Sequence, residues 1–262
     1  MRGVICYYSG SGNTKLACRY AAARLGLECD LVDVVRQPSV DLTSYDFVGL
    51  AASADFGGLP QAFVSFLEGL PAQGGKPAFA LNSYGFMNGR TLLDLVAQAH
   101  ARGFEVVGAH ALRMPESYPP MISLHMAFEN QPKPGEMRKF DAFIDRVRAA
   151  LGDAAASHPP VSTGLLASVS KARPRTSARD DMGEKHVDAD LCTECGTCAK
   201  QCPYGAIVLD PKPVFDQGAC FGCWRCYNQC PEHAIHTPKF RGGPYYPRPT
   251  EQAKAALQVT SS

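Results

Sequence analysis

Two cysteine runs near the C-terminus contain the residues best suited to redox chemistry. Each run has the pattern C-x2-C-x2-C-x3-C-P, and a shift of 28 residues maps Cys192 onto Cys220. Thiolates at this spacing bind cubes of four irons and four sulfides, with three ligands from one run and the fourth from the other. We assign one predicted [4Fe–4S] cluster to Cys192, Cys195, Cys198 and Cys230, and the other to Cys220, Cys223, Cys226 and Cys202.

Two structural zinc sites or a disulfide framework are the alternatives for these cysteines. A single C-x2-C pair also occurs in zinc ribbons, but zinc sites normally draw on two separated pairs rather than on four crowded thiols. Pro203 and Pro231 close the two runs, and the repeat extends to Ala206-Ile207 and Ala234-Ile235. Eight ligands in two matching runs favour two [4Fe–4S] clusters.

Composition excludes several other classes of protein. The chain has 262 residues, which is enough for a large core and a second, small domain. Charged residues make up 19% and the formal net charge is +1, so we expect no nucleic-acid partner. The sequence has no signal-peptide pattern and no apolar stretch long enough to span a bilayer. We therefore expect a cytoplasmic protein of anaerobic or microaerobic cells, with its 11 cysteines kept reduced.

A loop of small residues follows the first apolar run of the chain. Residues 2–8 predict a strand, and Ser9-Gly10-Ser11-Gly12-Asn13-Thr14 leads into a predicted helix over 14–25. This geometry presents backbone N–H groups to a phosphate. The loop lacks the Gly-Lys-Ser/Thr ending of a Walker loop, and Lys15 stands where a dinucleotide fingerprint needs its third glycine. An ordinary strand–helix turn remains the alternative.

Strands and helices alternate through the first 151 residues. The further predicted strands cover 28–34, 47–52, 77–81 and 104–112, and the further predicted helices cover 61–67, 90–102 and 135–151. This alternation predicts an α/β fold with a doubly wound, parallel, five-stranded sheet. Ligands of such sheets bind at the carboxyl ends of the strands, beside the change in strand order.

The chain resembles the fused flavodoxin-domain/ferredoxin-domain electron-transfer proteins of anaerobic bacteria and archaea. The resemblance implies FMN, with its phosphate bound by the hydroxyls of Ser9, Ser11 and Thr14 and by the backbone amides of Gly10, Ser11, Gly12, Asn13 and Thr14. It places the isoalloxazine against the loops after the third and fourth predicted strands, at Ala54, Asp55, Phe56, Gly57 and Gly58 and at Asn82, Ser83, Tyr84 and Gly85. Phe56 or Tyr84 would face the ring, and the glycines would allow close backbone approach.

The resemblance also divides the chain. Residues 1–151 would form the flavodoxin-like domain, 152–185 a linker, 186–238 a small α+β ferredoxin-like domain with two clusters, and 239–262 an extended tail. Flavodoxins are usually acidic, whereas residues 1–150 carry 14 basic and 14 acidic side chains. The loop after the third predicted strand has no tryptophan, and we expect Trp224, between two cluster ligands, to shield a cluster from water.

Electron transfer is the function that these features favour. We expect electrons to pass among the two clusters, FMN and an external donor or acceptor protein, because FMN exchanges one or two electrons and each cluster exchanges one. One alternative is an FMN-dependent reductase of a small molecule such as a quinone or activated alkene, with a pocket built by residues 114–134. Another is a non-redox module with structural metal. A homodimer is a further arrangement, in which one subunit's cluster meets the other's flavin.

Overall fold

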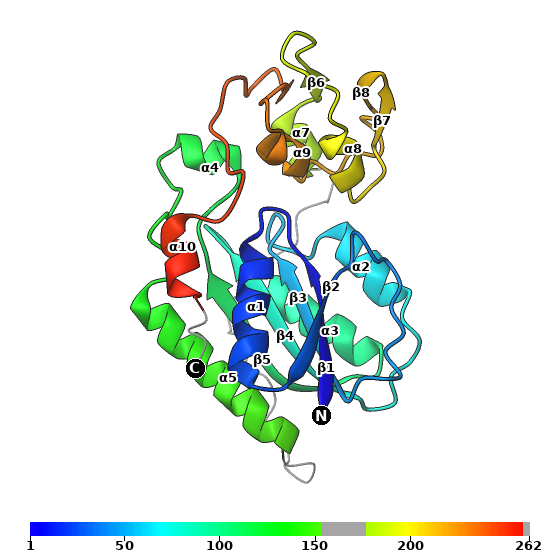
Figure 1. Cartoon of the computed structure of the whole chain (residues 1–262), viewed down its shortest axis with the longest axis vertical. Coiled ribbons are helices and arrows are strands. Elements are labelled where there is room, and N and C mark those ends of the chain that lie inside the picture. Colours follow the sequence, from blue (N-terminus) through cyan, green and yellow to red (C-terminus); the bar gives the residue numbers. More distant parts are fainter. Residues whose placement is uncertain (153–176, 259–262) are drawn as a thin grey trace.

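A five-stranded parallel sheet forms the centre of the N-terminal domain (Figure 1). The computed structural model describes residues 1–152 and 177–258 of the chain. The strands have the order β2-β1-β3-β4-β5, so the order reverses between β1 and β3. Their bounds are Arg2–Tyr8 for β1, Glu28–Asp33 for β2, Phe47–Ser53 for β3, Pro77–Tyr84 for β4 and Glu105–Arg113 for β5. The predicted doubly wound sheet is confirmed, although β4 continues through Asn82 and Ser83, which we expected in a loop.

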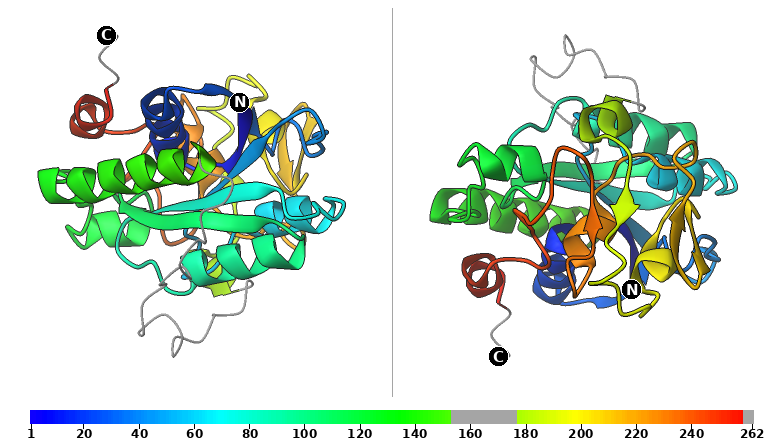
Figure 2. Two further views of the ribbon diagram at one scale, coloured as in Figure 1. Left: turned by 90° about the horizontal axis from the view of Figure 1, so that it is seen from below. Right: turned by 90° about the horizontal axis from the view of Figure 1, so that it is seen from above.

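Helices cover both faces of this sheet, as the two end-on views show (Figure 2). One face is covered by α1 (Asn13–Leu25) and α5 (Pro134–Gly152), and the other by α2 (Gln61–Glu68) and α3 (Thr91–Ala101). A short helix, α4 (Pro119–Ser123), follows β5. Because the central strands are buried on both sides, β3 is almost entirely apolar, with the sequence FVGLAAS.

Glycine allows an aromatic ring to lie flat against β3. A Cβ atom on Gly49 would lie 2.4 Å from Cζ of Phe79 and 2.8 Å from Cγ1 of Ile5. The Phe79 ring also meets Phe143 of α5 edge to face, with 6.1 Å between the ring centroids. The absence of a side chain at Gly49 therefore sets how closely α5 approaches the sheet.

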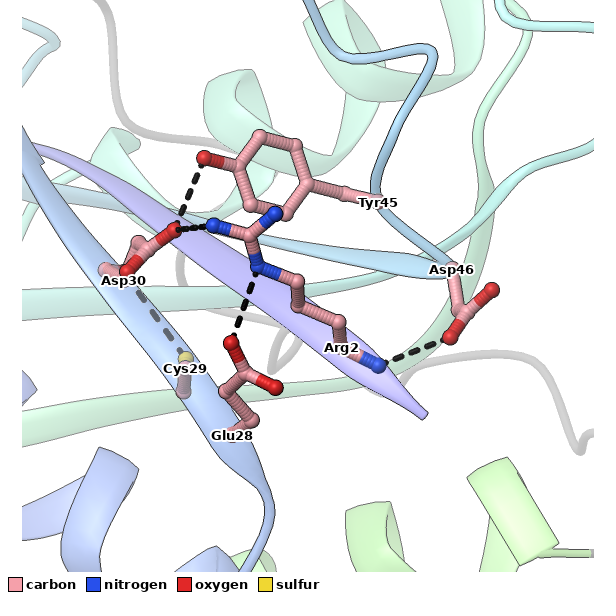
Figure 3. Close-up of polar contacts among 6 residues, drawn as sticks. All are labelled: Arg2, Glu28, Cys29, Asp30, Tyr45 and Asp46. Carbon is pink, nitrogen blue, oxygen red and sulfur yellow. Dashed lines mark hydrogen bonds and ion pairs between the residues drawn. The ribbon is translucent and has the colours of Figure 1, made fainter.

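A polar cluster fixes the opposite, amino-terminal edge of the sheet (Figure 3). Arg2 forms ion pairs with Glu28 at 3.1 Å and with Asp30 at 2.8 Å, and its backbone N–H donates to Asp46. The Tyr45 hydroxyl donates to Asp30. Exposed pairs of this kind contribute about 0–1 kcal/mol each, so they serve mainly to join β1 to β2 and to the segment before β3.

The cysteine-rich C-terminal region forms a second, small domain above the carboxyl ends of the strands (Figure 1). It contains two antiparallel pairs, β6 (His186–Val187) with β9 (Ile235–His236) and β7 (Ile207–Asp210) with β8 (Lys212–Phe215). Its helices are α7 (Ser177–Met182), α8 (Thr197–Gln201) and α9 (Arg225–Gln229). This is the small α+β domain that the sequence predicts, and we call residues 177–238 the cysteine domain and residues 1–152 the sheet domain.

The predicted linker and tail differ in part from what the structure describes. Residues 153–176 of the linker lie outside the described residues, while Met182 and Lys185 are buried in the cysteine domain. The tail, expected to be extended, includes a helix, α10 (Glu251–Ala256), whose Ala253 packs with Leu257 on the α1 and α5 face of the sheet domain. None of the helices within residues 1–152 and 177–258 combines the length and apolar character needed to cross a membrane.

Replacing Gly49 should destabilise the fold. We expect Gly49→Ala to lower the free energy of unfolding by about 1–3 kcal/mol, because the new methyl group overlaps the Phe79 ring. Thermal unfolding followed by far-ultraviolet circular dichroism, at one scan rate, measures the effect. Gly152→Ala is the matched control, since nothing lies within 4 Å of a Cβ atom there. Equal melting temperatures for the two variants would contradict the close contact.

Candidate functional site

A cavity of about 350 Å³ lies between the carboxyl ends of the strands and the cysteine domain. Its volume is within the range of small-molecule and cofactor sites. Most of the predicted flavin-site residues line it, namely Gly10, Ser11, Asn13, Ala54, Asp55, Phe56, Gly57, Ser83, Tyr84 and Gly85. Gly222, Cys223, Trp224 and Asn228 of the cysteine domain line it as well. We call this space the flavin cavity.

The loop after β1 is shaped by its own side chains. Ser9 does not line the flavin cavity; its hydroxyl accepts hydrogen bonds from the backbone N–H groups of Gly12 at 3.1 Å and Lys15 at 3.2 Å. Gly12 has a φ of 95°, which favours glycine, and it immediately precedes α1. These contacts tie the loop to the first turn of α1, the end of a helix where an anion binds most readily.

Three further residues of the predicted flavin site do not line the flavin cavity but form hydrogen bonds beside its lining. The Thr14 hydroxyl lies 2.8 Å from the Ser83 hydroxyl and so joins the loop after β1 to the end of β4. The Asn82 side chain is fully buried and donates to the Asn88 side chain at 2.6 Å. Gly58 closes a turn with Asp55 through two backbone hydrogen bonds. These residues position the lining of the flavin cavity without belonging to it.

The cysteine domain holds the same loop from above. The buried Arg225 guanidinium donates to the Ser9 carbonyl at 3.2 Å, and the Gln229 amide donates to the Gly10 carbonyl at 3.0 Å. Both residues belong to α9, which lies between the second-run ligands Cys223 and Cys230. The loop expected to bind phosphate is therefore bonded to a helix that carries cluster ligands.

A tyrosine in the tail completes this contact. The Tyr246 hydroxyl donates to Oδ1 of Asn13 at 2.8 Å, and the Asn13 amide donates to the Pro115 carbonyl at 3.0 Å. The Tyr246 backbone N–H donates to Asn228, whose own amide donates to the Ser117 carbonyl at 2.9 Å. Tyr246 of the tail therefore bonds to both domains, at Asn13 and Asn228, and each of these two residues also bonds to the segment after β5.

An indole ring occupies a strained position in the cavity wall. Trp224 has a φ of 60°, which is uncommon for a bulky residue, whereas the repeat places Gly196 at the matching position with a φ of 72°. The Trp224 and Tyr118 rings meet edge to face, with 5.8 Å between their centroids. The Tyr118 and Phe56 rings also meet edge to face, with 5.2 Å between their centroids. Strain of this kind gathers at functional sites. The sequence pattern alone did not indicate this role, although the repeat pairs Trp224 with a glycine.

Two buried polar atoms in the cavity wall have no hydrogen-bond partner among the described residues. They are the Tyr8 hydroxyl and the Trp224 indole N–H, in side chains that are 2% and 3% exposed. A buried polar group without a partner costs about 1–3 kcal/mol. A ligand with polar atoms along an aromatic ring would satisfy them, so the wall fits a flavin.

The eight cysteines of the two runs surround two smaller cavities. One, which we call the distal cavity, is lined by Cys192, Cys195, Cys198 and Cys230. The other, the flavin-side cavity, is lined by Cys202, Cys220, Cys223 and Cys226. The structure therefore brings together the same four cysteines that the sequence analysis assigns to each cluster. Among the described residues, no three His, Cys, Asp or Glu side chains form a group able to hold a single metal ion.

The flavin-side cavity joins the flavin cavity at Cys223, which lines both. Burial raises the pKa of the Cys223 thiol to about 11, and the nearby Lys185 ammonium partly offsets this effect. The Lys185 Nζ atom lies 2.8 Å from Cys220 Sγ. Burial alone would lower the pKa of Lys185, but the Cys226, Cys220 and Cys223 thiolates outweigh it and raise the pKa. Thiolates are the form that binds iron, so a cluster bound here would displace the thiol protons.

Three other residues whose types could do chemistry, His110, His125 and Cys6, line none of the three cavities. Met114 and Tyr118 of the irregular segment after β5 line the flavin cavity, but His125 does not. His110 stacks on two phenylalanines of α5, and burial lowers its pKa to about 4, as suits a core residue. Burial also raises the pKa of the Cys6 thiol to about 12. Cys6 therefore behaves as a packing residue.

Comparisons with known proteins cover both domains. A flavodoxin domain family matches residues 4–78, and a 4Fe-4S binding domain family matches residues 185–208 and 213–236. No curated protein matches the chain.

Three solved structures illustrate the likeness. A flavodoxin from the domain Archaea is 14% identical, with 58% of this chain and 100% of that chain covered and a TM-score of 0.42. The Streptococcus pneumonia TIGR4 flavodoxin is 17% identical over 57% of this chain and 99% of its own, with a TM-score of 0.43. A flavone reductase is 10% identical, with 63% of this chain and 68% of that chain covered and a TM-score of 0.46.

The family matches give the chain its cofactors, FMN for the flavodoxin domain and one [4Fe–4S] cluster for each of the two cysteine runs. The chain thus contains a region that matches a flavodoxin domain and two regions that match a 4Fe-4S binding domain, in the domain order that the sequence predicts.

Proposed function

We propose that the protein exchanges electrons with an external redox partner and delivers them between two [4Fe–4S] clusters and FMN within one chain. The observation that carries the proposal is the position of Cys223, which lines both the flavin-side cavity and the flavin cavity. A cluster bound through Cys223 would lie at the wall of the flavin site, so both domains of a single chain suffice for the contact.

The cofactors supply the electron chemistry, since FMN exchanges one or two electrons and each cluster exchanges one. The chain's part is binding and positioning. The loop after β1 would hold the FMN phosphate, with the Ser9 hydroxyl fixing the loop and the first turn of α1 providing amides. Phe56, Tyr118 and Trp224 would exclude water from the flavin side of the cluster.

The distal cavity is the favoured place for an external one-electron partner. Its ligand Cys195 is exposed, whereas Cys220 and Cys226 of the flavin-side cavity are buried. Potentials and electron exchange depend on the solvent exposure of a cluster and on its surroundings. Electrons would therefore enter or leave at the distal cavity and meet the flavin through Cys223 and Trp224.

A reductase acting on a small molecule is a second candidate. The observation that favours it is the open rim of the flavin cavity, where Phe86 is 44% and Met87 is 52% exposed. A quinone-sized substrate could reach a bound flavin from that side. Oxidation of the reduced holoprotein by a soluble quinone, at a rate that saturates with quinone concentration, would support this candidate over a pure electron carrier.

Removing Cys223 tests the main proposal. Wild-type protein purified without oxygen should contain FMN and about eight irons and eight sulfides, from two clusters of four. We expect Cys223→Ala to lose the flavin-side cluster, so that its iron falls by about half while FMN is retained. Reduction of its flavin by a reduced bacterial ferredoxin, which is too large to enter the flavin cavity, should slow by at least about tenfold.

The control for this experiment is Cys29→Ala, because Cys29 of β2 lines none of the three cavities. Its iron content and flavin reduction should match the wild type. Zinc instead of iron in the wild-type protein, or reduction of the flavin at equal rates in both variants, would refute the proposed route.

Trp224 offers a direct reporter of flavin binding, because it is the only tryptophan in the chain. Adding FMN to protein depleted of flavin should quench tryptophan fluorescence until one equivalent is bound. Trp224→Ala should weaken FMN binding by about tenfold, since an aromatic contact contributes about 0.5–1.5 kcal/mol beyond its buried area. Phe221→Ala is the control, because Phe221 faces Tyr204 outside the flavin cavity. Unchanged fluorescence at full FMN occupancy would contradict the assignment.

The tail should contribute to FMN binding through Tyr246. We expect Tyr246→Phe to weaken FMN binding by about two- to tenfold, because it removes a buried hydrogen bond to Asn13, a contact that contributes about 0.5–1.5 kcal/mol. Tyr245→Phe alters a neighbouring hydroxyl that contacts the cysteine domain instead. Flavin fluorescence titration compares the two variants, and an equal loss of affinity in both would show that Tyr246 has no specific role.

A further inference from the structure

The distal and flavin-side cavities have matching backbones but different charges. The 28-residue repeat that relates their cysteines also pairs most of the other residues in their walls. Since the thiolate ligands are the same in kind and number, any difference between the two clusters must come from the side chains and solvent around them.

Lys185 is the largest such difference. It lines the flavin-side cavity, it is 3% exposed, and its Nζ atom lies 2.8 Å from Cys220 Sγ. The repeat places Pro213 at the matching position in the distal cavity, which has no charge there. One cavity therefore contains a buried ammonium in contact with a ligand, and the other contains none at that position.

Arg225 adds a second positive charge on the same side. It lines the flavin-side cavity and is 5% exposed, and the matching residue of the distal cavity is Thr197. The Arg225 guanidinium donates to the Ser9 carbonyl and to the Gln201 side chain, and both of these acceptors are uncharged.

The distal cavity carries the opposite charge. Glu194 and Glu232 line its wall, and both are exposed. At the matching positions on the flavin side stand Gly222 and Tyr204. Exposed carboxylates act weakly because water and salt screen them, so we assign them the smaller part of the effect.

Other charges near the runs largely balance. Arg179 donates to the Gln217 and Gly218 carbonyls beside the flavin-side run, and Arg241 forms an ion pair with Asp188 beside the distal run. Lys212 donates to the Ala189 carbonyl, just before the distal run, without lining the distal cavity.

Reduction adds one negative charge to a cluster, so nearby cations favour the reduced form and nearby carboxylates oppose it. Burial acts in the other sense, because a low-dielectric site disfavours added charge. Coulomb attraction grows as distance and dielectric constant fall. We therefore expect the Lys185 ammonium, in contact with Cys220, to favour the reduced cluster by more than the partial burial of the flavin-side cysteines disfavours it.

We propose that Lys185, assisted by Arg225, makes the cluster of the flavin-side cavity the more easily reduced of the two. This rests on the proposed function and adds a direction to it. When an external one-electron donor protein gives up an electron, the donor is oxidised and the cluster beside the flavin cavity is reduced. The asymmetry therefore favours electron occupancy of the cluster next to the flavin cavity over that of the distal cluster.

An anaerobic redox titration of the holoprotein, followed by electron paramagnetic resonance, tests the proposal. Wild type should show two separate one-electron transitions. Lys185→Met should lower the upper potential by at least about 59 mV, the equivalent of a tenfold change for one electron, and leave the lower one unchanged. Lys185→Arg should restore the upper potential because it retains the charge. Lys200→Met, an exposed lysine of α8 that lines neither cavity, should change neither.

A second variant keeps the test decisive where Lys185→Met fails to bind its clusters. Glu232→Gln should raise the lower potential and leave the upper one, because it removes a negative charge from the distal cavity alone. Equal potentials in the wild type, equal shifts of both clusters in Lys185→Met, or no recovery in Lys185→Arg would each overturn the proposal. These outcomes differ from failure of the proposed function, which would show as absent iron, sulfide or FMN.

Discussion

The hydrogen bonds from α9 to the loop after β1 are the contact on which the arrangement of cofactor sites depends. Arg225 and Gln229 donate to the Ser9 and Gly10 carbonyls, and both side chains stand between cluster ligands in the sequence. Peptide carbonyls in a phosphate-binding loop point away from the anion, so they are free to accept from another domain while the amides face the ligand. One short helix thereby holds the flavin loop and the flavin-side cluster ligands at a fixed separation.

This contact explains why the flavin cavity has walls from both domains. A free flavodoxin-type domain would leave the carboxyl ends of its strands open to solvent, and a stacking residue would have to come from its own loops. Here the cysteine domain covers that edge and contributes Trp224, while Asn228 and Tyr246 tie the segment after β5 to the tail. The neutral charge balance of residues 1–150 is consistent with a flavin site that meets its redox partner within the chain.

Sequence patterns predicted the elements whose signals are local. Buried parallel strands read as apolar runs, and the thiol spacing was specific enough to group eight cysteines as the two cavities group them. Contacts between domains have no such signature. Trp224 lines a cavity shared with the sheet domain, and Lys185 contacts Cys220, which is 35 residues away in the sequence. The helix α10 forms because Ala253 and Leu257 pack on the sheet domain. Thr250, whose hydroxyl accepts from the Ala253 N–H, was a readable start signal for that helix.

The internal repeat gives the most general account of how function arises in this chain. A perfect repeat would form two equivalent cluster cavities, and neither cluster would then be more easily reduced than the other. The two halves depart from each other where Gly196 is matched by Trp224, Thr197 by Arg225 and Pro213 by Lys185. All three substituted side chains are buried, and each lines the flavin cavity or the cluster cavity next to it. The ligand spacing thus makes the clusters possible, and the departures from symmetry distinguish the cysteine cavity that adjoins the flavin cavity.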